Sequence, residues 1–447
     1  MLPGPIVALL GHIPFIVASS LPTEYTAMAS SDDNYGNKLV GIVSNRQSAS
    51  DYDDDMKRAQ YAGIDAFALN IGTDSYTDTQ LGFAYQSAAN NGMKVFISFD
   101  FNWWQTSQGN AVGAKIAQYA NLPAQLKVDG KVFVSSFAGD GVDIAAIRAA
   151  ADSDIYFAPN FHPGRGDFSD LQAALSWIAW ENNGSNGSPT PSKQVVVADS
   201  DNAYKTALNG KPYIASTSPR FVELLTWNDY GESHYIGPLS SPHMDDGASK
   251  WVMGMPHNGW LDMAKPFIAA YKAGSKLPIR FLDEEKLIYW YRTTPKDVNC
   301  DATDTTMQGC SNSWSGNFVC GRPDGAVDMT DEVFIVTMLK TPATVHVQSG
   351  CEAETYDAKA GIWSHSVPMG VGRQSFKVVR EGKTVDSLCG ISRMDITDTC
   401  PCGIYNFNAY VGTLPAEASI DRLQPAGLAL LSQGLQIACP TSTLGAR

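Results

Sequence analysis

The segment YAGIDAFALNIGTDSYTDTQLGFAYQSAANNGMKVFISFD, residues 61–100, decides the fold class of this chain. Its apolar spacing predicts a strand over residues 65–70, a helix over 78–89 that ends near Gly92, and a second strand over 94–99. Two strands joined by a helix run parallel, because the helix returns the chain to the edge where the first strand began. The segment therefore predicts an α/β fold with a parallel sheet.

The same alternation continues on both sides of this segment. Further helices are expected over residues 51–61, ending at Gly63, and over 260–272. Eight strand–helix units in this length predict a (β/α)8 barrel of the TIM type over residues 38–285. The eight expected strands are 38–43, 65–70, 94–99, 131–137, 154–158, 176–180, 212–215 and 221–227.

One join does not fit this barrel. Only residues 216–220 separate the seventh and eighth strands, whereas neighbouring parallel strands need a crossover of about a dozen residues or more. Either one strand is assigned wrongly, or the two strands are not parallel neighbours, or part of the barrel is missing. An incomplete barrel is therefore one outcome of the prediction.

The chain changes character after about Glu285. Short β-type runs at 333–339, 344–347 and 375–379, with Gly and Pro turns between them, predict a β-sandwich over residues 286–447. All eight cysteines of the chain lie in this part, between Cys300 and Cys439.

Disulfides are the expected role of these cysteines, because their number is even and they are confined to one region. Zinc is the alternative, but Cys400 and Cys402 are too close for a zinc knuckle. Residues 1–37 are interpreted as a signal-like, unstructured N-terminus, since 6–17 are apolar, although no Lys or Arg precedes Lys38. Together these features predict a secreted protein, extracellular or in a cell wall.

Composition excludes some classes of function. The net charge is −14, which argues against nucleic acid or an anionic membrane as a partner. Hydrophobic residues make up 44% of the chain and charged residues 17%, so a packed core is expected. Phosphate-binding loops and spaced metal ligands such as HExxH are absent from the sequence. We expect no metal and no cofactor, and a monomer.

Candidate catalytic residues lie where strands of such a barrel end, because barrel enzymes place their active sites at the C-terminal ends of strands. The eighth expected strand runs into WNDYGESHY, residues 227–235, which sets Asp229 and Glu232 three positions apart. Gly231 allows the backbone to turn between them. Glycoside hydrolysis needs two carboxyl groups, one to protonate the leaving oxygen and one to activate water or attack the sugar. Asp100, at the end of the third strand, is a third candidate acid.

Aromatic, amide and imidazole side chains at the strand ends are expected to bind sugar, by stacking or by hydrogen bonds. Simpler roles stay open: Asn228 and Asp229 also form an ordinary turn signal, and Asp100 could cap the next helix. Asp53, Asp54 and Asp55 are interpreted as a solvated helix N-terminus. The expected substrate-binding residues are Asn70, Trp103, Trp104, Asn160, His162, Trp180, Trp227, Asn228, His234 and Tyr235.

Several segments resemble glycoside hydrolase family 71, the fungal α-1,3-glucanases or mutanases. The most specific is WNDYGESHYIGPLSSPH, residues 227–243. The resemblance spans about Lys38 to Leu414, with its motifs in the family's order. The other matching segments are 61–78, 92–104, 129–139, 155–164, 287–300 and 404–412.

The resemblance implies a (β/α)8 barrel followed by a β domain, and hydrolysis of α-1,3-glucosidic bonds with inversion of configuration. It implies an α-1,3-glucan as substrate and places the essential acids at Asp229 and Glu232, with Asp100 as a further acid. Inversion needs the two carboxyl groups about 6.5–9.5 Å apart, to admit a water. Glu232 is expected as general acid and Asp229 as general base; an exchange of these roles, or a share for Asp100, stays open.

Two departures from the family stand out. A His-containing end of the first strand is absent after Val40, and residues 216–219 stand where members carry a long insert. The second gap coincides with the crossover that the strand spacing lacks. A mispredicted splice and a truncated, inactive paralogue both explain it, so the alternative function is a non-catalytic protein that binds α-glucan or cell wall.

Overall fold

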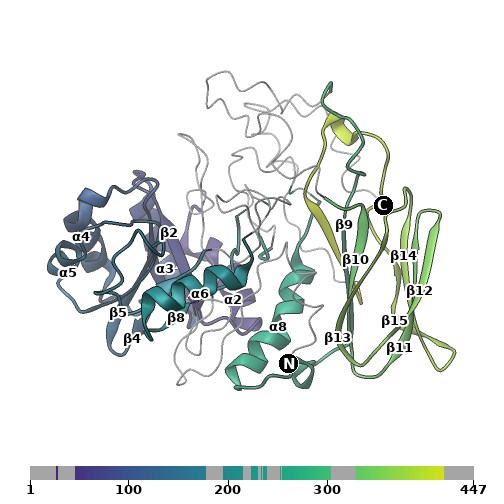
Figure 1. The fold of residues 1–447 in the computed structure, drawn as a ribbon, viewed down its shortest axis with the longest axis horizontal. Coiled ribbons are helices and arrows are strands. Elements are labelled where there is room, and N and C mark those ends of the chain that lie inside the picture. Colours follow the sequence, from purple (N-terminus) through teal and green to yellow (C-terminus); the bar gives the residue numbers. More distant parts are fainter. Residues whose placement is uncertain are drawn as a thin grey trace.

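The computed structural model has a helix-covered parallel sheet at one end and two antiparallel sheets at the other (Figure 1). Among the residues that it describes, no helix is long and apolar enough to cross a lipid bilayer. The described residues are 27–28, 46–177, 195–214, 223–229, 233, 235–238, 252, 254–303 and 329–416.

Four parallel strands form the main sheet, in the order β2-β3-β5-β6. They confirm four of the expected strands, each within two residues of its expected ends. Two short strands extend the sheet: β1 pairs parallel with β2, and β4 antiparallel with β5. The bounds are β1 Ala27–Met28, β2 Ala66–Ile71, β3 Lys94–Asp100, β4 Lys127–Val128, β5 Lys131–Phe137 and β6 Ile155–Asn160.

The short strand β1 lies within residues 1–37, which were expected to be unstructured. That expectation is wrong for Ala27 and Met28, because they pair in parallel with Ala66 and Phe67 of β2. The first strand expected at 38–43 lies outside the described residues.

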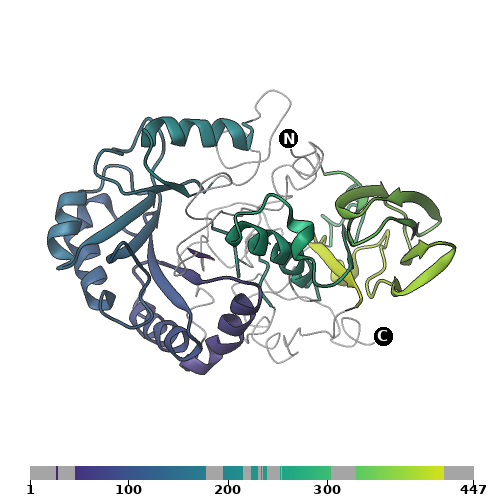
Figure 2. The same cartoon turned by 90° about the horizontal axis from the view of Figure 1, so that it is seen from below.

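Four helices cover one face of the main sheet, on the outside of its curve (Figure 2). Helices α2 and α3 end where the sequence predicts. The backbone of Gly63 has φ +87° and that of Gly92 has φ +70°, a left-handed conformation that glycine adopts without steric cost. The bounds are α2 Asp53–Tyr61, α3 Thr77–Asn91, α4 Gly109–Tyr119 and α5 Ile144–Ala150.

The second half of the expected barrel is only partly formed. Strand β7 Ala174–Leu175 pairs in parallel with β8 Tyr213–Ile214, and helix α6 Val197–Leu208 connects them. The sixth strand, expected at 176–180, thus lies earlier, and residues 178–180 are outside the described part.

The eighth expected strand, 221–227, is wrong for the residues that are described, because 223–227 pair with no strand. Their backbone closes a loop instead: Ile236 N–H donates to Thr226 O at 3.1 Å, and Gly237 N–H donates to Trp227 O at 2.8 Å. The connection from the end of β8 to this segment, 215–222, is shorter than the crossover of about a dozen residues that neighbouring parallel strands need.

The antiparallel sheets form the predicted β-sandwich. One sheet has the order β13-β10-β9-β16 and the other β12-β11-β14-β15. Apolar side chains from both fill the space between them, with the rings of Tyr289 and Phe376 stacked at 4.1 Å. The bounds are β9 Lys286–Arg292, β10 Glu332–Leu339, β11 Ala343–Ser349, β12 Glu352–Ala358, β13 Gly361–Pro368, β14 Gln374–Arg380, β15 Lys383–Ile391 and β16 Ala409–Leu414.

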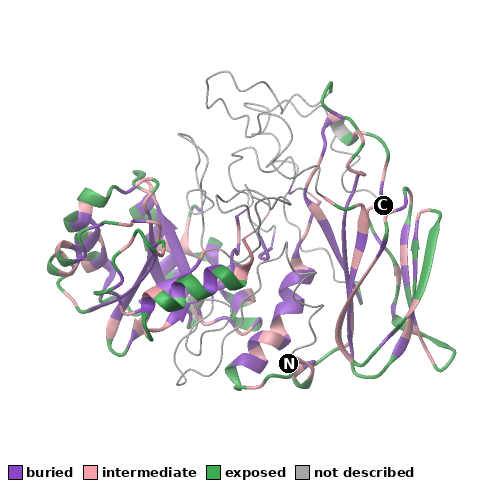
Figure 3. Cartoon of the chain, in the orientation of Figure 1, coloured by how far each residue is buried: buried purple, intermediate pink, exposed green. Residues whose placement is uncertain are grey.

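Helix α8, Asn258–Lys272, joins the two parts and confirms the helix expected at 260–272. The side chains of Ile288, Trp290 and Val411, on the outer face of the first sandwich sheet, belong to the same apolar core as those of α8. The buried colour along α8 and the strands beside it follows this core (Figure 3). The β-sandwich is therefore packed against the rest of the chain through α8.

A disulfide closes the end of the sandwich near β9. Cys300 bonds to Cys400, 100 positions away, and this bears out the expected disulfide-bonded domain. Cys351 and Cys389 are free and exposed. The remaining cysteines lie outside the described residues or, for Cys402, have an undescribed side chain.

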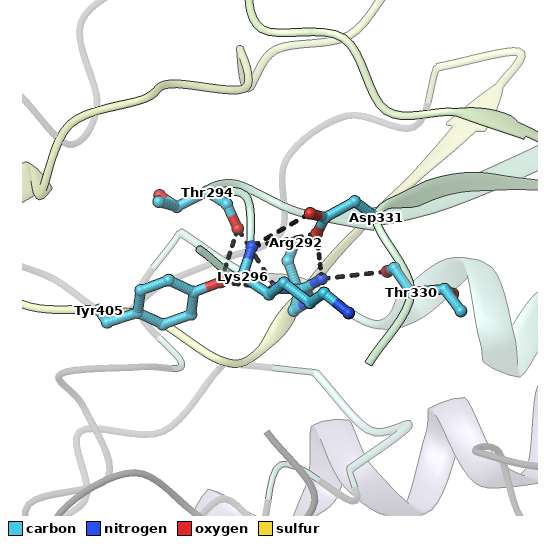
Figure 4. A network of polar contacts seen from close by, with 6 residues as sticks. All are labelled: Arg292, Thr294, Lys296, Thr330, Asp331 and Tyr405. Atoms are coloured by element: carbon cyan, nitrogen blue, oxygen red, sulfur yellow. Dashed lines mark hydrogen bonds and ion pairs between the residues drawn. The ribbon is translucent and has the colours of Figure 1, made fainter. Parts of the chain in front are cut away.

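At the end of β9, the buried guanidinium of Arg292 joins three segments (Figure 4). It donates to Asp331 Oδ1 at 2.5 Å, to Thr330 O at 3.0 Å and to Tyr405 Oη at 2.5 Å. Tyr405 Oη in turn donates to Thr294 O at 2.8 Å. One cation thus fixes loops that are far apart in the sequence.

Candidate active site

One face of the main sheet carries three of the expected site residues, Asn70, Asp100 and Asn160, near the carboxyl ends of its strands. Asp100, Phe137 and Asn160 are in register across β3, β5 and β6. Asn70 pairs with Ser98, one row below. Since parallel strands lie about 4.8 Å apart, the Cα atoms of Asp100 and Asn160 are separated by about 10 Å.

This face is the one that the helices leave uncovered. Phe67, Leu69 and Ile71 of β2 belong to the core that includes α2 and α3, whereas Ala66 and Ala68 belong to a smaller cluster on the opposite face. Because side chains alternate along a strand, Asn70 shares the face of Ala66 and Ala68. The polar strand ends therefore face inward, on the concave side of the sheet, as in a barrel enzyme.

The carboxylate of Asp100 is held at the point where β3 ends. Its side chain is 1% exposed, and Oδ1 accepts the backbone N–H of Asn102 at 2.8 Å. Its backbone carbonyl accepts the N–H groups of Trp103 and Trp104 at 3.0 and 2.9 Å. Asp100 thus makes a local turn contact and does not cap the next helix, the simpler interpretation of this residue, because that helix begins at Thr106 with Gln105 as its N-cap.

The two tryptophans that follow Asp100 differ in exposure. Trp104 is buried against Phe99 and donates its indole N–H to Ile71 O and Gly72 O, both at 3.1 Å. Its ring has no open face for a sugar in this conformation. Trp103 is half-buried beside Gly72, where an added Cβ would come within 3.3 Å of the Trp103 ring. Of the pair, Trp103 is therefore the better placed for stacking on a sugar.

Asn160 at the end of β6 is buried and fully engaged. Its amide donates to Tyr204 Oη at 2.9 Å and to Leu175 O at 3.1 Å, and its Oδ1 accepts from Ala138 N at 3.4 Å. This amide joins β6 to β7 and α6, so it organises this edge of the sheet.

His162 is exposed and bonds to a carboxylate that the sequence reading missed. Asp140 accepts from the His162 backbone N–H at 2.6 Å and contacts Nδ1 at 2.6 Å. Asp140 follows the end of β5, so its place after a strand was the available signal. The pair fixes the ring of His162 and leaves Nε2 pointing away from the carboxylate.

The motif that carries the main acids is described at 227–229, 233 and 235–238. Asp229 is 5% exposed, and its backbone N–H donates to Thr226 Oγ1 at 2.9 Å. Asn228 Oδ1 is buried and has no hydrogen-bond partner within the described part of the chain. Glu232, His234 and Trp180, three of the expected site residues, lie outside the described residues.

Trp227 begins this motif, and its side chain is held by a residue of helix α2. It is 3% exposed and donates its indole N–H to Asp55 Oδ1 at 3.0 Å. Asp55 Oδ2 accepts from Arg46 Nη2 at 2.7 Å. Burial raises the pKa of Asp55, and the nearby Arg46 opposes this shift. The interpretation of Asp55 as solvated is therefore wrong, because the helix turns this side chain into the core.

Tyr235 at the other end of the motif is fully buried. Its hydroxyl donates to Met255 O and accepts from Asn408 Nδ2, the latter at 2.8 Å. Its ring stacks on His257 at 3.9 Å, and the His257 nitrogens contact Tyr235 O at 2.8 Å and Ala409 O at 3.0 Å. Tyr235 therefore ties the motif to the sandwich strand β16.

Glu223, just before the motif, is a second carboxyl that the sequence reading missed. It is 2% exposed, and burial raises its pKa to about 8. The sequence does contain a pattern that indicates a buried carboxyl here, since Glu223 is a single acid within the apolar run FVELL, residues 221–225. A carboxyl that keeps its proton near neutral pH has the property required of a general acid.

The described residues thus place one buried carboxyl group, Asp100, at the end of β3 and another, Asp229, in the motif. Trp227, which leads into Asp229, packs against Phe67 on the helix-covered face of the sheet, so the contacts described here do not join the two carboxyl groups. Carboxyl groups in different environments can separate the roles of proton donor and proton acceptor. Such an arrangement suits the cleavage of a glycosidic bond by water.

Comparisons with known proteins agree with this chemistry. A mutanase of Penicillium rubens is 38% identical over 445 residues, covering 91% of this chain and 94% of its own length. A glucan endo-1,3-α-glucosidase of Schizosaccharomyces pombe is 32% identical, covering 82% of this chain and 91% of its own. Among solved structures, an endo-β-1,4-mannanase of Thermotoga petrophila covers 86% of this chain and 98% of its own at a TM-score of 0.38 and 8% identity, too low to assign a common fold.

The model of glycosyl hydrolase family 71 matches residues 36–221 and 215–424. The two matched segments meet at 215–221, the place where the expected crossover is absent. Together they include the parallel sheet, the motif and the sandwich strands. The chain therefore belongs to glycosyl hydrolase family 71.

Proposed function

We propose that this protein hydrolyses α-1,3-glucosidic bonds within fungal cell-wall α-glucan. The observation that carries the proposal is the motif at 227–235, with a buried Asp229, in a chain 38% identical to a mutanase over 91% of its length. The half-buried Trp103 and the imidazole of His162 are the described groups best placed to contact the polymer.

For the chemistry we propose an inverting mechanism. Glu232 gives its proton to the oxygen of the leaving sugar, and Asp229 takes a proton from a water that attacks the anomeric carbon. One water is consumed, and the two carboxyl groups exchange their protonation states. Asp100, rigidly held at the end of β3, stabilises the charge that develops on the sugar ring. Acid–base hydrolysis of this kind needs only carboxyl groups and water.

The finer architecture belongs to the same proposal. The parallel sheet and the β7–β8 pair would be parts of one (β/α)8 barrel over 38–285, followed by a β domain over 286–447. We further propose a secreted monomer that acts outside the cell or in the wall. The inward polar strand ends support the barrel, and the disulfide supports an oxidising compartment.

The test is release of reducing sugar from insoluble α-1,3-glucan by the whole chain. Glu232→Gln and Asp229→Asn should each lose activity by about 10³-fold or more, because each removes a proton-transfer group. Glu354→Gln, which alters an exposed carboxyl of the sandwich, is the matched control. Full activity in Glu232→Gln would remove it from the acid role.

A second candidate function rests on the break at 215–221, where the two family matches meet. A barrel that lacks a crossover would keep its sandwich and bind glucan without cleaving it. Retention of the folded wild-type chain on insoluble α-1,3-glucan, with no sugar released, would favour this role. Sugar release by wild type and not by Glu232→Gln would exclude it.

A further inference from the structure

Residues outside the motif hold Trp227, the residue that leads into Asn228 and Asp229. Asp55 lies in the first turn of α2, 172 positions before Trp227 in the sequence. One of its oxygens accepts the indole N–H of Trp227 at 3.0 Å, and the other accepts from Arg46 Nη2 at 2.7 Å. Both oxygens of one carboxylate are thus committed to two different segments.

The Arg46 side chain is itself fixed. Its guanidinium lies over the ring of Tyr52, 5.0 Å from the ring centre. Its backbone carbonyl accepts from Gln80 Nε2 at 2.8 Å, and Gln80 Oε1 accepts from Tyr52 Oη at 3.0 Å. Helix α3, which carries Gln80, thereby anchors the arginine that holds Asp55.

The indole of Trp227 is enclosed on its other sides. Its ring meets the ring of Phe67 edge-on at 5.2 Å. At Gly237 an added Cβ would lie 2.6 Å from Trp227 O and 2.7 Å from the indole nitrogen. The Gly237 N–H donates to Trp227 O at 2.8 Å, so the two ends of the motif loop meet at this residue.

A buried ion pair is a poor way to gain stability alone, because the cost of removing two charges from water offsets much of their attraction. Apolar side chains of similar size would fill the same space at lower cost. The ion pair instead orients the Trp227 side chain, because the Asp55 carboxylate accepts the indole N–H and so sets the angle of the ring. That angle sets where the backbone enters the turn that carries Asp229.

We infer that Asp55, oriented by Arg46, is a positioning residue for the turn at 227–229, which carries Asp229, one of the acids of the proposed active site. It touches no substrate and acts through Trp227. A displacement of about 1 Å at a catalytic group costs about 100-fold in rate, so a loss of this hydrogen bond should reach catalysis. This inference rests on the proposed function for its kinetic readout only.

The decisive variant is Asp55→Asn. Its amide keeps the shape of Asp55 but offers a single oxygen to two donors, so either Trp227 or Arg46 loses its acceptor. The matched control is Asp53→Asn in the same turn of α2, whose carboxylate bonds to Ser87 Oγ at 2.7 Å and Asn91 Nδ2 at 2.8 Å and not to the motif.

The kinetic assay uses soluble α-1,3-glucan oligosaccharides below the melting temperature of each variant. Asp55→Asn should lower kcat by about 10- to 100-fold with KM changed less than about threefold, while Asp53→Asn stays within about threefold of wild type. Trp227→Phe, which removes only the indole donor, should lower kcat similarly. The double variant should be no worse than Trp227→Phe alone, because both changes break one hydrogen bond.

A second readout needs no activity. The indole N–H resonance of Trp227, assigned by its loss in Trp227→Phe, should shift in Asp55→Asn and stay in place in Asp53→Asn. If wild type cleaves no α-1,3-glucan, the proposed function fails and this resonance still tests the positioning contact. If Asp55→Asn does not fold, Trp227→Phe carries the kinetic test with the ion pair intact.

Two results would overturn the inference. One is an unmoved Trp227 resonance in Asp55→Asn. The other is an equal loss of kcat and of melting temperature in Asp55→Asn and Asp53→Asn, which would mark the carboxylate as structural only.

Discussion

The buried carboxyl of Glu223 should make the stability of this protein fall as pH rises through the neutral range. Burial raises its pKa from 4.5 to about 8, with no compensating charge among the causes of the shift. In the unfolded chain the same group ionises near 4.5. Between these two values the folded state holds one more proton than the unfolded state, so its stability falls as pH increases.

The size of the effect follows from the shift. From 4.5 to about 8 is about 3.5 pKa units, and each unit corresponds to about 1.4 kcal/mol, which makes about 5 kcal/mol in all. Glu223→Gln removes the titration but keeps the shape. The difference in unfolding free energy between the variant and wild type should therefore change by about 5 kcal/mol in favour of the variant from pH 4 to pH 9.

Urea unfolding followed by tryptophan fluorescence at half-unit pH steps measures this difference. Any fixed cost of placing an amide at this position shifts the curve without changing its slope. Glu352→Gln, which alters an exposed carboxyl of the sandwich, is the matched control and should give a curve parallel to that of wild type. Parallel curves for Glu223→Gln and wild type between pH 5 and 8.5 would refute a buried, proton-holding Glu223.

Three further predictions concern single contacts. Gly237→Ala should lower stability by about 1–3 kcal/mol in urea unfolding, because its Cβ would lie 2.6 Å from Trp227 O; unchanged unfolding would mean that the loop is not closed there. Replacement of Cys300 and Cys400 by serine should cost about 4.7 kcal/mol by loop entropy over 100 positions, seen as a lower urea midpoint; an equal midpoint under oxidising conditions would rule out this bond. Arg292→Met should cost about 3–5 kcal/mol, since it leaves buried acceptors unpaired; a melting temperature equal to that of wild type would contradict the network.

Local spacing was enough to predict the elements of the parallel sheet. Strands β2, β3, β5 and β6 lie within two residues of expectation, because each is a short apolar run that is buried almost throughout, as is typical of a parallel sheet. Gly63 and Gly92 also marked the ends of their helices, since only glycine takes a left-handed conformation there without strain. In the sandwich, the runs expected at 333–339, 344–347 and 375–379 correspond to three of its strands, β10, β11 and β14.

Predictions that depended on distant partners did less well. The segment 223–227 has the composition of a strand, but a strand forms only where a neighbour supplies hydrogen bonds, and the short connection before it provides none. Trp104 and Trp227 resembled sugar-stacking residues, but their rings are enclosed by the core. Composition does not distinguish a buried tryptophan from an exposed one.

The sequence by itself determined the α/β class, the four long strands of the parallel sheet, the disulfide-bonded β domain and, through its motifs, the family. Tertiary structure alone decided which acids are buried and what holds them. Asp55 and Trp227 stand 172 positions apart, and no local pattern relates them. Their contact exists because one face of α2 packs on the sheet. Of the three adjacent aspartates in its first turn, that packing buries Asp55 against Trp227.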